Sequence, residues 1–103
     1  MNECTPLSRE MLPNRMPVTT GSEAIDFRKA KELADRTARS VSDDAMLLAW
    51  LDGTTGRFSP FVVCCGEKKP AWLIYAESRG ANLSVDVNEG QYVFVYLASE
   101  KEV

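Results

Sequence analysis

The chain has 103 residues, of which 45% are hydrophobic and 26% charged, and it carries a net charge of -3 with no histidine. This length predicts a single domain, since independent cores typically need about 50 to 200 residues. The acidic balance argues against binding to nucleic acid or an anionic membrane surface, both of which depend on clustered Lys and Arg, and no apolar run is long enough for a transmembrane helix.

The first 18 residues have no sustained helical or strand period and contain three prolines, Pro6, Pro13 and Pro17. We therefore expect residues 1–18 to form an irregular N-terminal arm and residues 19–103 to form the single domain. The N-terminus also lacks the apolar core of a secretory signal, which favours a cytoplasmic location.

Residues 22–41 are predicted to form an amphipathic helix. Thr20 and Glu23 have the spacing of a capping box that would begin it. Its apolar side chains recur every three or four residues and form one stripe, whose members are Phe27, Ala30, Leu33, Ala34, Ala38 and Val41. The opposite side is charged, with acidic and basic groups interspersed, as on a solvated surface.

Five strands are predicted after the helix, at residues 45–52, 58–65, 71–78, 82–87 and 91–98. Each is a short apolar or alternating run bounded by Gly, Pro, Asn or Asp. Short connections favour antiparallel neighbours. The predicted fold is therefore α+β, with one N-terminal amphipathic helix packed on a five-stranded, mainly antiparallel meander sheet.

Three of these strands are apolar on both faces, whereas the fourth alternates, with Ser84 and Asp86 on the side typical of solvent exposure. One helix covers only one face of such a sheet. We expect a second copy of the chain to cover the other face, giving a homodimer, with another protein or a small molecule as the alternative occupant. The aromatic residues that would supply the interface, or stack on a ligand, are Trp50, Trp72, Tyr75, Tyr92, Phe94 and Tyr96.

Two groups of residues are candidates for chemistry. Cys64 and Cys65 would point to opposite faces of a strand, so they cannot jointly chelate one metal, but one thiol near a lysine suits redox chemistry; burial as small apolar residues is favoured. Glu77, Arg79 and Asp86 cluster around one turn and would suit acid–base work or cation binding, although surface ion pairs and turn capping are the favoured explanation. No metal site or cofactor is predicted, and the lack of histidine removes the commonest general base.

The sequence resembles a small family of prokaryotic proteins of similar length that has no assigned function. The resemblance covers residues 20–98 and is carried by the stretches DAMLLAW at 44–50, CCG at 64–66, KPAWLIYAESRG at 69–80 and YVFVY at 92–96. It implies a prokaryotic cytoplasmic protein and transfers no site residues. We therefore expect a non-catalytic homodimeric binding module, with a thiol-dependent redox or metal-handling protein and a small-molecule binder as the alternatives.

Overall fold

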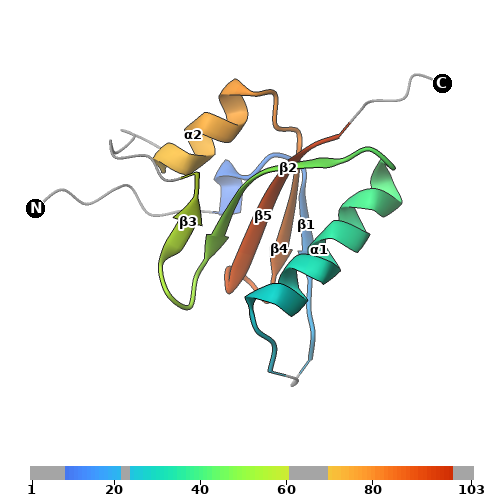
Figure 1. Ribbon diagram of the computed structural model, residues 1–103, viewed down its shortest axis with the longest axis vertical. Helices are drawn as coiled ribbons and strands as arrows, with labels where there is room; N and C mark the ends of the chain where they lie inside the picture. Colours follow the sequence, from blue (N-terminus) through green and yellow to red (C-terminus); the bar gives the residue numbers. More distant parts are fainter. Residues whose placement is uncertain (1–8, 22–23, 61–69, 99–103) are drawn as a thin grey trace, which may run out of the picture.

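The fold is α+β, with a five-stranded mixed sheet that carries a helix on each face (Figure 1). The computed structural model describes residues 9–21, 24–60 and 70–98. In chain order the elements are a 3-10 turn at Arg9–Met11, β1 at Arg15–Val18, α1 at Phe27–Val41, β2 at Met46–Asp52, β3 at Arg57–Ser59, α2 at Ala71–Ser78, β4 at Leu83–Val87 and β5 at Tyr92–Leu97. The sheet order is β1-β4-β5-β2-β3.

The predicted helix is confirmed as α1, but it begins later than expected. Its N-cap is Asp26, whose side chain accepts a hydrogen bond from the Lys29 amide at 2.9 Å. An aspartate in this position accepts a hydrogen bond from a backbone amide that has no partner within the first turn. The sequence predicted that Thr20 would accept this hydrogen bond. Three fully buried alanines, Ala30, Ala34 and Ala38, then bring the helix close to β4 and β5.

The strand predicted at 71–78 is wrong, because these residues form α2. Their apolar run is short and lacks a clear period, and such a run does not distinguish a strand from a buried helix. Pro70 stands at the N-cap, and Gly80, at a φ of 94°, ends the helix. The Gly80 amide donates to the Glu77 carbonyl and the Ala81 amide to the Ala76 carbonyl, the paired bonds of a Schellman motif.

The topology also differs from a meander. Residues 15–18, assigned by sequence to the irregular arm, form β1 and pair in parallel with β4 at one edge of the sheet. The other described strand pairs are antiparallel. Strand β3 is paired with β2 over Arg57–Ser59 only, and the remainder of the strand predicted at 58–65 falls largely on residues 61–69, outside the described residues.

The two helices cover different parts of the sheet. Helix α1 packs on β4 and β5, while α2 packs on the opposite face of β2 and β5. This accounts for the strands that are apolar on both sides, since β5 is covered above and below. A second copy is therefore not required to cover a whole sheet face, because α2 lies there.

The polar side of β4 is buried as well, so the half-exposed strand expected there is wrong. Ser84 is 0% and Asp86 is 1% exposed. Asp86 is paired with Arg15 from β1, a strand that the sequence did not predict. Both faces of β4 are therefore buried. One face contributes to the apolar core, and the other carries the polar residues Ser84 and Asp86, which do not face water.

Candidate functional site

The first part of β2 pairs with β5 on one side. Strand β3 pairs with Trp50, Leu51 and Asp52 in the later part of β2, and the residues after Pro60 are outside the described part of the chain. A bulge between Leu47 and Ala49 interrupts the register with β5.

Two exposed hydrophobic side chains lie near the start of β2. Met46 is 57% and Val41 is 54% exposed, and only the turn at 42–45 separates them, closed by a bond from the Ala45 amide to the Ser42 carbonyl. Leu47 and Trp50, on the following part of β2, are half-buried. We call the two exposed side chains, Val41 and Met46, the β2 patch.

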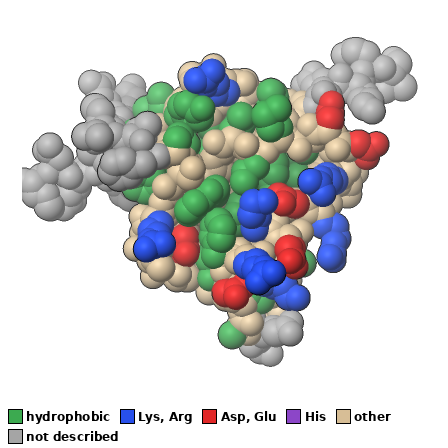
Figure 2. Space-filling view, in the orientation of Figure 1, with side chains coloured by type: hydrophobic (Ala, Val, Ile, Leu, Met, Phe, Trp, Pro, Cys, Tyr) green, Lys and Arg blue, Asp and Glu red, His purple; other side chains and the backbone are tan. Residues whose placement is uncertain are grey.

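Charged groups surround rather than enter the β2 patch. Figure 2 shows Lys, Arg, Asp and Glu side chains gathered over α1, with hydrophobic side chains exposed beside that helix. Asp43 and Asp44 precede β2 and are exposed, as is Arg57 at the start of β3. Sequence reasoning missed Val41 and Met46 as site residues, since it assigned Val41 to the helix core; the position of Met46 soon after a polar turn was the available clue.

Two residues of the predicted Glu77, Arg79 and Asp86 cluster make contacts in different places. Asp86 accepts from Arg15 Nε at 2.7 Å and from the Gly90 amide at 2.6 Å. Arg79 instead lies at the end of α2, with its guanidinium carbon 4.9 Å from the Tyr75 ring centroid. Across the described ranges no group of three or more acidic, Cys or His side chains is placed to hold a metal.

The six aromatic candidates lie in three different places. Four of them are on the α1 face of the sheet: Trp50, Tyr92, Phe94 and Tyr96. Phe27 of α1 packs among these rings, 4.5 Å from Trp50 and 5.5 Å from Phe94 between centroids. Trp72 and Tyr75 both belong to α2 on the opposite face, where Trp72 is buried and Tyr75 is half-buried, so the six aromatic residues form no common ligand-stacking surface.

Tyr96 has a definite structural role, because it ties α1 to the sheet. Its hydroxyl donates to Asp35 Oδ1 at 2.7 Å, and Lys31 donates to the other oxygen at 2.8 Å. Burial disfavours the charged form of Asp35, but the hydrogen bonds from Lys31 and Tyr96 outweigh it and lower the pKa of this carboxyl. Burial, together with the neighbouring carboxylate, raises the pKa of Tyr96.

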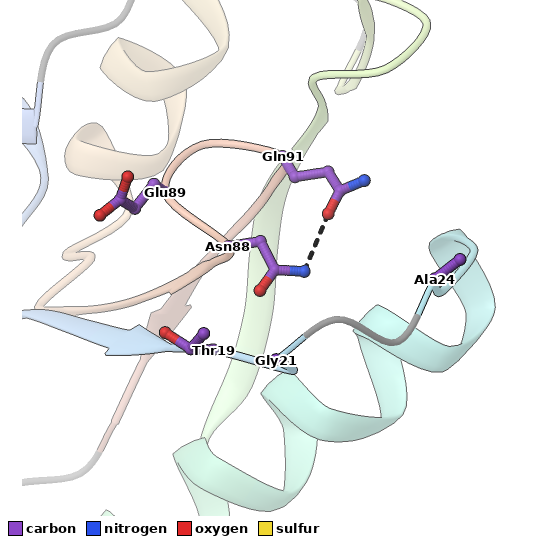
Figure 3. Close-up of a pocket in the computed structure, with 6 residues that line it drawn as sticks. All are labelled: Thr19, Gly21, Ala24, Asn88, Glu89 and Gln91. Carbon is purple, nitrogen blue, oxygen red and sulfur yellow. Dashed lines mark hydrogen bonds between the residues drawn. The ribbon is translucent and has the colours of Figure 1, made fainter.

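A shallow polar pocket of about 380 Å³ lies beside the β4–β5 turn (Figure 3). It is lined by Thr19, Gly21, Ala24, Asn88, Glu89 and Gln91. The Asn88 amide group donates to Gln91 Oε1 at 2.8 Å and to Thr20 Oγ1 at 2.9 Å, and its oxygen accepts from the Thr20 amide. These bonds occupy Asn88 in joining the turn to the segment after β1, a role that the sequence did not indicate.

Cys64 and Cys65 lie outside the described residues, so the thiol hypothesis stays a prediction. Among the helices that are described, none combines the length and apolar character needed to cross a membrane.

The fold and surface define a small α+β protein with helices on both faces of its sheet and with two exposed apolar side chains near the start of β2. A family described as a domain of unknown function, DUF5619, matches residues 13–96, and the chain belongs to this family. The family resemblance found by sequence is thereby confirmed.

A sequence comparison and a structure comparison each find similarity to a protein from Archaeoglobus fulgidus. An uncharacterised protein is 42% identical over 66 residues, which span 61% of this chain and 70% of the relative. A crystal structure of a protein described as novel has a TM-score of 0.65 and 32% identity, covering 88% of this chain and 100% of that one. Neither description names an activity, so both support the fold and the family.

Proposed function

We propose that this protein is a non-catalytic interaction module that binds its partner through the β2 patch. The observation that carries the proposal is the exposure of two large apolar side chains, Val41 at the end of α1 and Met46 at the start of β2. Large apolar side chains exposed close together are typical of surfaces that bind another protein.

The burial pattern favours this surface over a ligand site on the aromatic residues. Trp50, Phe94 and Tyr96 pack against or beneath α1, where they contribute to the core. The polar pocket near Asn88 is lined by an amide whose bonds already hold the chain together. The β2 patch, by contrast, exposes two large apolar side chains within five residues of one another in sequence.

Site-specific photocrosslinking tests the proposal. A benzoylphenylalanine at Met46 is expected to give adducts in a lysate of the source organism, whereas the same group at Ile74 is not. Ile74 is the matched control because it is a large apolar side chain, 42% exposed, and belongs to α2 rather than to β2. Equal adduct yields at the two positions, or none at Met46, would contradict the proposal.

A further inference from the structure

We infer that the solvent face of α1 binds an acidic segment of another protein. This face consists of five exposed side chains, Arg28, Lys29, Glu32, Arg36 and Arg39. We call these five the α1 basic row. None of them belongs to the β2 patch, so the inference goes beyond the proposed function and does not depend on it.

The α1 basic row runs along one side of the helix. The three alanines that pack on the sheet, Ala30, Ala34 and Ala38, lie on the opposite side. Since successive residues turn by about 100° around a helix, the five exposed positions fall within about 100° of one another. From Arg28 to Arg39 the row is about 16 Å long, at a rise of about 1.5 Å per residue. Basic side chains therefore gather on one surface along α1 (Figure 2).

The charge of this surface is more one-sided than the sequence of α1 indicates. The helix has five basic and two acidic residues, from which the sequence predicts a solvated face of mixed charge. In the structure the carboxylate of Asp35 accepts hydrogen bonds from the Tyr96 hydroxyl of the sheet at 2.7 Å and from Lys31 at 2.8 Å. Lys31 and Asp35 thus neutralise each other, and the α1 basic row keeps four cations and a single carboxylate, that of Glu32.

Stability of the fold does not account for the two cations at the start of α1. The first turn contains Arg28 and Lys29 and no acidic residue, and both side chains are exposed. The N-terminal end of a helix carries a partial positive charge, so cations there are unfavourable for the helix. Residues that break such a local rule without contributing to the core are expected at functional sites.

Two shallow hollows lie along the α1 basic row, and Glu32 borders both. The first, of about 280 Å³, is lined by Asp26, Arg28, Lys29 and Glu32. The second, of about 360 Å³, is lined by Glu32, Asp35, Arg36 and Arg39. Both hollows have two basic side chains in their lining, so acidic side chains of a partner can enter beside cations at either end of the row.

The charges favour an acidic protein segment over nucleic acid. The whole chain has a net charge of -3, so a long polyanion is repelled by the remainder of the surface. A short segment responds mainly to the α1 basic row, because charges more than about 8 Å away are screened at physiological ionic strength. Glu32 would also repel a phosphate backbone laid along the row, whereas a protein segment can place a basic side chain opposite it.

An NMR titration of the isotope-labelled full chain with octaglutamate at low salt tests the inference. Amide shifts are expected to concentrate in residues 27–41, with a dissociation constant on the order of 100 µM. Octaglutamine is expected to cause no shifts, and oligothymidylate of the same total charge is expected to bind at least about threefold more weakly.

Matched charge reversals locate the contact. Arg36→Glu and Arg57→Glu change the net charge equally, and Arg57 is exposed on β3 rather than on α1. Arg36→Glu is expected to weaken octaglutamate binding about tenfold, and Arg57→Glu less than about twofold.

Lys29→Glu separates binding from structure. It is expected to weaken octaglutamate binding and yet to raise the midpoint of thermal unfolding, since an acid replaces a cation in the first turn. Equal weakening by Arg36→Glu and Arg57→Glu, or shifts that spare α1, would overturn the inference. Tighter binding of oligothymidylate than of octaglutamate would overturn it as well and would assign the surface to nucleic acid.

Discussion

The two faces of β4 are buried by different means. On one face Leu83, Val85 and Val87 meet the alanine stripe of α1, and the contact is apolar. On the other face Ser84 and Asp86 are buried just as fully, but Asp86 is satisfied by Arg15 and the Gly90 amide. Polar alternation in a strand therefore does not report solvent exposure when a neighbouring strand supplies the counter-charge.

The α2 side depends on a small number of buried side chains. Leu73→Ala is expected to lower the free energy of unfolding by about 2 to 5 kcal/mol, since Leu73 is 0% exposed and its removal leaves a cavity. Urea denaturation measures the loss. Ile74→Ala, at the exposed neighbouring position, is the control and is expected to cost less than about 1 kcal/mol. Equal losses would show that α2 does not pack through Leu73.

The ion pair on the polar face is sensitive to the loss of one partner. Arg15→Met is expected to cost about 2 to 3 kcal/mol, because the buried Asp86 carboxylate keeps only its bond from the Gly90 amide. The double variant Arg15→Met with Asp86→Leu is expected to be more stable than Arg15→Met alone, since it removes the unpaired charge. A double variant with the summed loss of both single changes would contradict this account.

On the apolar face a polar bond joins Tyr96 to Asp35. Tyr96→Phe is expected to cost about 1.5 kcal/mol at neutral pH, since it removes a hydrogen bond to a charged group. The lowered pKa of Asp35 adds stability that is present above its unfolded pKa and is lost as pH falls through the folded value. The difference between wild type and Tyr96→Phe should therefore shrink in denaturation curves recorded below pH 3.8, the ordinary pKa of an aspartate side chain.

The smallest effect is expected at Ser84, whose buried hydroxyl has no hydrogen-bond partner among the described residues. Ser84→Ala is expected to change stability by no more than about 0.5 kcal/mol, since no bond is lost. The matched control is Ser42→Ala, which removes a bond to Asp44 and is expected to cost about 1 kcal/mol. Thermal unfolding of both variants compares them, and a larger loss at Ser84 would mean that its hydroxyl is bonded.

Sequence reasoning succeeded where local pattern and tertiary environment agree. The stripe of α1 has a clear helical period, and it identified the buried Ala30, Ala34 and Ala38. The strands at 46–52, 83–87 and 92–97 were also expected, within one residue or so of their ends. In these segments the apolar pattern itself causes the burial, so the buried positions can be predicted from the sequence.

Prediction from the sequence failed where the tertiary environment, rather than the local apolar pattern, determines the structure. Helix α2 is apolar on most sides, so its period is hidden, although Pro70 and Gly80 mark its ends. Strand β1 contains Pro17, and this proline led to the prediction of an irregular arm. A proline is tolerated here because β1 is at the edge of the sheet. The exposure of Val41 and Met46 depends on which neighbours the fold places around them, a tertiary feature that no short motif encodes.

The position of β5 has a consequence for how the protein is made. It joins β4 to β2, and so connects the β1–β4 pair to the β2–β3 hairpin. During synthesis both pairs of neighbours, together with α1 and α2, emerge from the ribosome before the strand that unites them. The sheet can therefore be completed only after residue 97 has left the exit tunnel, and until then both helices have only part of their packing surface.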